Sequence, residues 1–357
     1  MRPYNLAALR PKLSWLVCLL LLQAACVQQP EPVDVMAPAD SSAGLTGPLH
    51  TVTIITPDWP PLEKLFVAGL GLEETGNRKV EPSALAIQRQ LWGIPETIAW
   101  RTRILSRPAV PGTAQLRVLV TDVATSAHRL SWDRQELGPY GMGFPTLDVF
   151  AWDEQLRGLG FERATPEVEV FDVTAPNGRV YNVHEATFLG PEFMRVIAIS
   201  RKGGLPQVGI FDAVTQRGGP AYATQIVPDI DAMLGLLTEV LDYEVRSDRT
   251  WSEYPIPFRF TLVHARGSTT GHVALVEYAA EHTRSGSGVP PRPPARGMVM
   301  WSFQVTDLAA VMARAAARNV EPVAGPVTYT SPSLGPHTAM TFLAPNGFLI
   351  EVFQRDE

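Results

Sequence analysis

Four segments of the chain share one pattern of apolar and polar positions. Each opens with a β-like run, reaches an aspartate, and continues with apolar residues at helical spacing. An aspartate at this point predicts a helix N-cap, because its carboxylate accepts a hydrogen bond from a free amide of the first turn. The pattern therefore predicts four copies of one structural unit. Their capping residues are Asp58, Asp148, Asp229 and Asp307.

Further β-like runs follow each predicted helix, such as ETIAWRTRIL and AQLRVLV in the first unit. The separation between the capping aspartate and the glutamate after its helix alternates between 15 and 14 residues along the chain. The tetrapeptide APNG occurs in units two and four only, at 175–178 and 344–347. We interpret APNG as a hairpin turn, because Asn and Gly tolerate the positive φ of tight turns.

These repeats predict a duplicated domain. Units one and two are expected to form an N-terminal domain over residues 49–205, and units three and four a C-terminal domain over residues 217–357. Equivalent positions of the two APNG turns would follow from this duplication. The stretch from Ser285 to Arg296 is rich in Pro and Gly, so it is predicted to be an irregular loop between units three and four.

The first 48 residues follow a different pattern. Arg2, Arg10 and Lys12 precede the apolar run 13–22, and small residues then lead to Cys26. This pattern predicts an export signal over residues 1–26, since the apolar run is shorter than the roughly 20 residues of a membrane-spanning helix. Residues 27–48, rich in Pro, Ser and Ala, are predicted to be a flexible tether.

The end of this signal, LLQAAC, resembles the lipobox of bacterial lipoproteins, although Gln23 stands where leucine is usual. The resemblance implies that Cys26 is lipidated and begins the mature chain. Cys18, inside the signal, is the only other cysteine of the sequence, so no disulfide is expected. The expected location is the periplasmic side of a bacterial cell envelope, with the membrane as a partner through the lipid anchor.

Composition further limits the kinds of binding partner that are expected. The sequence has 45% hydrophobic and 18% charged residues, which is typical of a globular protein. A net charge of -6 and a pI near 5.7 give no general basic surface, so nucleic acid is not expected as a partner. The sequence gives no indication of the oligomeric state.

The segments FQVTDLAAVMARAAARNVEPVAGP and TFLAPNGFLIEVF resemble the vicinal oxygen chelate superfamily, which includes glyoxalase I, bleomycin-resistance proteins and extradiol dioxygenases. The similarity spans about residues 49 to 355. It implies an α+β fold of four β-α-β-β-β modules, paired into two cup-shaped half-open barrels. In this superfamily each cup surrounds a small-molecule site.

The resemblance also implies a divalent metal, Fe, Mn, Ni or Zn, as a possible cofactor. Its ligands would be His or Glu on a first strand, seven residues before the capping aspartate, and Glu on the strand after the last hairpin. The first-strand positions hold no usual ligand, and His50 is one residue out of register. These positions are Thr51, Gly141, Tyr222 and Met300.

The last-strand position is better matched. In unit four, Glu351 lies four residues after the hairpin glycine. The same count gives Asn182 in unit two, and His184 lies on the same face of that strand. In unit three, Glu277 is the nearest equivalent. The segment around His337 and Glu351 also partly resembles the extradiol dioxygenase signature. Thr341 stands where that signature has tyrosine, which argues against ring cleavage.

The site is therefore expected in the C-terminal domain, with Glu351 as the candidate metal ligand and the N-terminal domain as scaffold. The function predicted is binding of a small molecule with a degenerate or absent metal site. The alternatives are a divalent-metal-dependent lyase, isomerase or dioxygenase, and a structural module of the envelope. The expected lining residues are Tyr222, Glu277, Met300 and Glu351, with His264 or His337 nearby.

Overall fold

The computed structural model describes residues 44–76, 80–174, 180–202, 209–252 and 254–356. The predicted signal and residues 27–43 of the predicted tether lie outside these ranges. The first strand already begins at Thr46, so the last residues assigned to the tether belong to the fold. Within the described ranges, the protein has no helix of the length and apolar character needed to cross a membrane.

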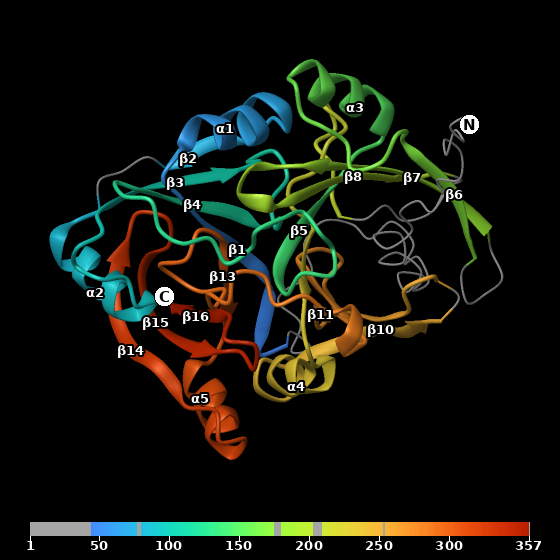
Figure 1. Ribbon diagram of the computed structural model, residues 1–357. Coiled ribbons are helices and arrows are strands. Elements are labelled where there is room, and N and C mark those ends of the chain that lie inside the picture. The colour runs from blue at the N-terminus through green and yellow to red at the C-terminus, as the bar shows by residue number, and fades with distance from the viewer. Residues whose placement is uncertain (1–43, 77–79, 175–179, 203–208, 253, 357) are drawn as a thin grey trace, which may run out of the picture.

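The described residues form two eight-stranded mixed sheets, whose arrangement Figure 1 shows. The first sheet has the order β14-β15-β16-β13-β1-β4-β3-β2. Its strands are β1 (Thr46–Thr56), β2 (Glu73–Gly76), β3 (Trp100–Ser106), β4 (Gln115–Thr121), β13 (Gly297–Val305), β14 (Pro322–Ser331), β15 (Gly335–Leu343) and β16 (Leu349–Arg355). Each half of this sheet is one module, with its first strand at the centre.

The second sheet has the corresponding order β10-β11-β12-β9-β5-β8-β7-β6. Its strands are β5 (Gly138–Pro145), β6 (Glu169–Thr174), β7 (Val180–Leu189), β8 (Arg195–Arg201), β9 (Tyr222–Ile226), β10 (Tyr243–Trp251), β11 (Phe258–Ala265) and β12 (His272–Tyr278). The four predicted β-α-β-β-β modules and the α+β class are therefore confirmed.

The predicted helices follow the first strand of each module. They are α1 (Trp59–Glu63) with its π-helical continuation η2 (Lys64–Gly69), α3 (Val149–Gly158), α4 (Ile230–Leu234) with η4 (Gly235–Val240), and α5 (Leu308–Ala317). Module one carries an additional helix, α2 (Pro82–Trp92), between its second and third strands. Two short 3-10 turns, η3 (Pro191–Phe193) and η5 (Ala280–His282), complete the described elements. Residues 285–296 form the predicted irregular loop.

The pairing of modules differs from the prediction. Strand β1 of module one pairs antiparallel with β13 of module four, and β5 of module two pairs with β9 of module three. The prediction that module one pairs with two, and three with four, is wrong. Every module presents the same first-strand edge, so the local sequence pattern is compatible with either arrangement. We call the sheet of modules one and four the first cup, and that of modules two and three the second cup.

The two APNG segments are also not equivalent. In module four the turn joins β15 to β16, the third and fourth strands of the module. Residues 175–178 lie outside the described residues, but the strands on either side are β6 and β7, the second and third of module two. The two APNG segments therefore do not mark equivalent positions of a duplicated domain.

Apolar side chains fill the space between the two sheets, and others cover the inner face of the second cup. The largest core cluster packs faces of both sheets against α1, α3, α4 and α5. A second cluster, which includes Tyr222, Phe260 and Tyr278, fills the second cup. The Tyr222 ring lies directly against Gly143 of the neighbouring strand, where a Cβ atom would be 1.8 Å from Tyr222 Cε1. The second cup is thus packed by its own side chains.

Candidate functional site

Strand register shows which residues of the four modules are related. The fifth residue before each capping aspartate lies on a first strand and pairs with one residue of the last strand of its module. These pairs are Thr53 with Arg117, Gly143 with Ile197, Thr224 with Ala274, and Ser302 with Glu351. Arg117 is therefore the counterpart of Glu351 in module one, and both belong to the first cup.

Arg117 and Glu351 form a buried ion pair at the centre of the first cup. Arg117 Nη2 lies 2.9 Å from Glu351 Oε2, and their side chains are 4% and 1% exposed. Ser302 Oγ donates to the same carboxylate oxygen at 2.6 Å, and Trp92 Nε1 donates to Oε1 at 2.7 Å. Both carboxylate oxygens of Glu351 are therefore hydrogen-bonded within the protein.

These contacts decide the charge of Glu351. Burial alone would raise the pKa of its carboxyl, but Arg117, Ser302 and Trp92 together hold the pKa below its usual value. Arg117 also lies over the Trp92 ring, with Cζ 4.8 Å from the ring centroid. The site thus holds one carboxylate and one guanidinium that neutralise each other.

His50 lies beside this pair. The β1–β13 register shifts between Leu49 and Thr51, which places His50 at a bulge. Its Nδ1 is 2.8 Å from Thr51 Oγ1, and its ring contacts that of Phe353 at a centroid distance of 5.0 Å. Burial, followed by the charges of Arg355 and Arg117, lowers the pKa of His50 to about 4. His50 is therefore neutral at pH 7.

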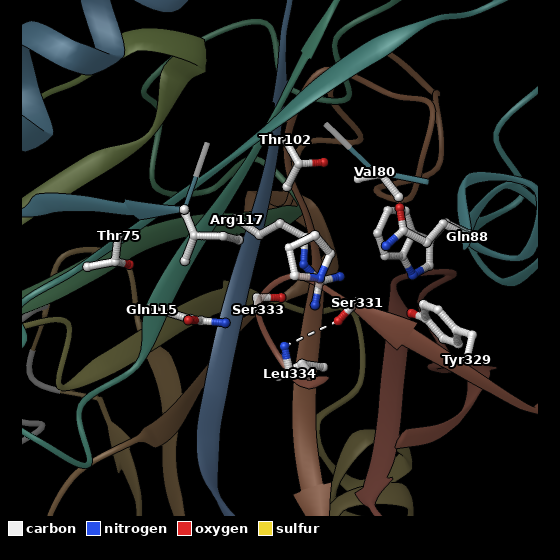
Figure 2. A pocket seen from close by; sticks show the side chains of 14 residues that line it. Thr75, Val80, Gln88, Thr102, Gln115, Arg117, Tyr329, Ser331, Ser333 and Leu334 are labelled. Atoms are coloured by element: carbon white, nitrogen blue, oxygen red, sulfur yellow. Dashed lines mark hydrogen bonds between the residues drawn. The ribbon is translucent and has the colours of Figure 1, made fainter. Parts of the chain in front are cut away.

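A cavity of about 250 Å³ opens onto Arg117 from the side of α2 and β14. Figure 2 shows the Arg117 guanidinium between Gln88 and Tyr329 on one side and Gln115 and Thr75 on the other. The walls combine aromatic and aliphatic side chains with hydroxyl and amide groups. The lining residues are Thr75, Gly76, Val80, Gln88, Trp92, Thr102, Ile104, Gln115, Arg117, Tyr329, Ser331, Pro332, Ser333 and Leu334.

The structure divides the predicted site residues between the two cups. Met300 and Glu351 face the interior of the first cup, and the buried His337 ring packs on Tyr329 at a centroid distance of 4.3 Å. Tyr222, Glu277 and His264 belong to the second sheet. The prediction that all six residues line one C-terminal cup is wrong, because it followed from the incorrect pairing of modules.

The three residues of the second sheet have other surroundings. Tyr222 belongs to the apolar filling of the second cup. Glu277 Oε2 accepts a hydrogen bond from Ile230 N at 2.7 Å, so its carboxylate caps the start of α4. The ring of His264 faces the ring of His272 at a centroid distance of 5.9 Å.

Asn182 and His184 are also not counterparts of Glu351. Both lie on β7, the third strand of module two, whereas the last strand is β8. His184 Nε2 is 2.6 Å from Asn182 Oδ1, and Asn182 Nδ2 donates to Asp172 at 3.1 Å. The prediction failed because it counted from the APNG segment, whereas the described strands on either side of that segment are the second and third of module two.

Sequence reasoning missed Arg117 and Trp92. Arg117 is the one charged residue in the run AQLRVLV, and a charge inside a buried strand signals a partner. Trp92 ends the additional helix of module one, which the four-fold repeat did not indicate. Gln115 is a further missed residue, whose Nε2 donates to Thr51 Oγ1 at 3.0 Å.

The residues of the first cup do not fit a divalent transition metal. Such a site needs three or four converging imidazole, thiolate or carboxylate ligands. The related positions hold Thr53, Arg117, Ser302 and Glu351, and the single carboxylate is already neutralised by the guanidinium. Among the residues that the structure describes, no group of three or more His, Cys, Asp or Glu could hold a metal ion.

Comparison with known proteins shows a sequence similarity over the C-terminal half of the chain. Residues 219–352 match the family model described as the Glyoxalase/Bleomycin resistance protein/Dioxygenase superfamily. No curated protein matches the chain in sequence. The matched residues comprise modules three and four, so this half of the chain is similar in sequence to that superfamily, and the whole chain shares the fold of four β-α-β-β-β modules.

Two solved structures resemble the whole fold. Glyoxalase I from Zea mays has a TM-score of 0.56 at 10% identity, covering 86% of this chain and 92% of that one. A putative dioxygenase from Bacillus subtilis has a TM-score of 0.52 at 15% identity, covering 88% and 87%. At these identities the similarity establishes the fold and leaves the chemistry to the site itself.

Proposed function

We propose that this protein binds a small molecule in the first cup, through protein groups rather than through a metal. The observation that carries the proposal is the cavity of about 250 Å³ that opens onto Arg117. Arg117 Nη1 is buried there and has no hydrogen-bond partner among the described residues. A buried guanidinium nitrogen is costly to leave unpaired, so a bound oxygen at this position would stabilise the complex.

The proposal assigns different roles to the two cups. The inner face of the second cup is filled by its own aromatic and aliphatic side chains. Such packing supports a scaffold role, since a close-packed interior has no room for a ligand. In the first cup, α2 covers only part of the sheet and leaves the cavity between Gln88, Tyr329 and Leu334.

We also propose that the protein acts at the bacterial cell envelope, anchored by an acyl chain on Cys26. The support is the basic and apolar N-terminal pattern that ends in LLQAAC. Mass spectrometry of the protein purified from a bacterial membrane fraction tests this proposal. A mature chain without acyl mass on Cys26, or one that begins at another residue, would contradict the anchor.

Ligand binding is tested with a library of small aromatic and aliphatic compounds by equilibrium dialysis. Trp92 lines the cavity, so its fluorescence gives an independent readout. The variant Leu334→Trp fills the cavity, whereas Leu130→Trp makes the same change at a residue that is 61% exposed. Binding should be lost in Leu334→Trp and kept in Leu130→Trp, with circular dichroism confirming that both variants fold. Equal binding by the two variants would place the ligand elsewhere.

A further inference from the structure

We propose that the Arg117 guanidinium takes the place of a metal in the first cup, and that the ligand is an uncharged single-ring compound whose oxygen accepts a hydrogen bond from Arg117 Nη1. This inference rests on the proposed function and adds the chemical class of the ligand. It follows from the orientation of Arg117, from the charge of the site and from the size of the cavity.

The orientation of Arg117 leaves one nitrogen available. Nη2 is held by Glu351 Oε2 at 2.9 Å and by Ser302 Oγ at 3.3 Å, and the guanidinium plane rests near the Trp92 ring. Arg117 as a whole is 3% exposed, and Nη1 has no partner among the residues that the structure covers. A guanidinium is a rigid planar group, so fixing Nη2 also fixes the direction of Nη1. Arg117 lines the cavity, so we assign its buried Nη1, which has no partner among the described residues, as the donor to a ligand oxygen there.

The charge of the site favours an uncharged ligand. Arg117 and Glu351 form a pair with no net charge, and His50 is neutral because its pKa is lowered to about 4. Of the cavity-lining residues that the structure describes, Arg117 alone carries a formal charge. An anionic ligand would therefore bring an uncompensated charge into a largely buried site, which costs more than a neutral acceptor.

The cavity limits the size and shape of the ligand. Its volume of about 250 Å³ equals roughly eight water molecules at their share of liquid volume, which suits one substituted ring. Trp92, Ile104 and Tyr329 supply apolar and aromatic walls for the ring. Thr102 Oγ1, also without a partner among the described residues, offers a second polar contact on β3.

Three probes of similar size test the ligand class on the unmodified protein by isothermal titration calorimetry. Acetophenone has a ring and a carbonyl acceptor, ethylbenzene has the same shape without the acceptor, and benzoate has a negative charge. A hydrogen bond from a charged donor predicts that acetophenone binds about tenfold to a hundredfold more tightly than ethylbenzene. Benzoate should bind more weakly than acetophenone at pH 7.

The double variant R117M/E351L tests the assigned donor. It removes the guanidinium and its partner together, so no unpaired charge remains in the core. This variant should bind acetophenone and ethylbenzene with about equal affinity. Because the wild-type comparison needs no substitution, the inference stays testable even if the double variant does not fold.

The outcomes separate this inference from the proposed function. Equal binding of acetophenone and ethylbenzene to the wild-type protein overturns the inference and leaves small-molecule binding intact. Stronger binding of benzoate than of acetophenone also overturns it, since the site would then select anions. A preference for acetophenone that survives in R117M/E351L contradicts the role of Arg117. Failure of all three probes and of the compound library overturns both proposals.

Discussion

At the scale of single residues, Arg117 and Glu351 stabilise the first cup only as a pair. Removing one partner leaves the other as a buried, uncompensated charge, and such changes cost about 3–5 kcal/mol. We therefore expect Arg117→Met and Glu351→Leu each to lower the free energy of unfolding by about this amount. The double variant should be far more stable than the sum of the single losses predicts, because it buries no charge.

Urea unfolding of the four proteins measures this coupling as a double-mutant cycle. The two side chains are nearly inaccessible to solvent, at 4% and 1% exposure, so screening by salt should change the result little. Additive losses in the cycle would show that Arg117 and Glu351 do not depend on each other, against the geometry described above.

The contact between Gly143 and Tyr222 gives a second prediction at this scale. In Gly143→Ala the new Cβ would be 1.8 Å from the Tyr222 ring, so the ring must move within a packed core. We expect Gly143→Ala to lower the free energy of unfolding by at least about 1–3 kcal/mol. Gly141→Ala is the matched control, because the nearest atom to its Cβ would be 3.7 Å away. Similar thermal unfolding of the two variants would contradict the close contact.

The residues of the site could be predicted only in part. Glu351 and Met300 face the first cup as the superfamily resemblance implied, because their distances from Gly347 and Asp307 are local properties of module four. The identity of the facing residue, Arg117, depends on which module lies opposite. No local pattern contains that information, so Tyr222 and Glu277 were placed in the wrong cup.

At the scale of elements, the helix caps confirm most of the sequence pattern. Asp148, Asp229 and Asp307 each accept a hydrogen bond from the amide three residues later, at 3.0, 2.9 and 2.9 Å. Asp58 makes no such bond, since the third residue after it is Pro61, which has no N–H. The pattern identified the position of the cap, while the proline removed its partner.

This difference predicts unequal effects of the same substitution. Replacing Asp148, Asp229 or Asp307 with alanine should lower the free energy of unfolding by about 1 kcal/mol, the usual value of an N-cap. Asp58→Ala should cost clearly less, because no side-chain cap hydrogen bond is lost. Thermal unfolding of the four variants under one condition measures the contrast. Equal losses at all four positions would mean that the aspartates act through charge alone.

The strands and their order within each module were also predictable, whereas α2 was not. It begins after Glu81 without an aspartate cap, and among the residues that the structure describes it has no counterpart in the other three modules. A search based on repetition therefore passes over the element that supplies Trp92 and Gln88 to the cavity. The proposed site therefore depends on a feature that distinguishes module one from the others.

At the scale of the whole molecule, His128 lies between the two sheets. Its ring fills the space beside Gly138 at the start of β5 and Gly297 at the start of β13, where a Cβ would approach it to 3.1 and 2.7 Å. Burial, and then the charge of Arg129, lowers the pKa of His128 to about 3. The folded protein therefore holds this histidine in its neutral form.

This position predicts sensitivity to acid. The unfolded chain binds a proton at His128 near pH 6.5 and the folded chain only near pH 3, so its stabilising contribution is complete above pH 6.5 and is lost as the pH falls. The loss should be about 1.4 kcal/mol per pH unit in this window. Between pH 7 and pH 4, the free energy of unfolding should depend less steeply on pH in His128→Phe than in the wild type. The difference should be about 1.4 kcal/mol per pH unit, because the variant lacks the one proton that His128 binds on unfolding. Parallel curves for variant and wild type would contradict the prediction.

Modules two and three form one sheet and modules one and four form the other, and this pairing sets an order of assembly during synthesis. Modules two and three are neighbours in the sequence and can join β5 to β9 as soon as both have emerged from the ribosome. Module one must wait for module four, since Arg117 and Glu351 are 234 positions apart. Contacts of such high sequence separation form slowly, and β1 keeps an open edge until β13 arrives. The cavity of the first cup is therefore the last part of the molecule to form, and a chain cut short before module four would keep the second cup without ever forming the proposed site.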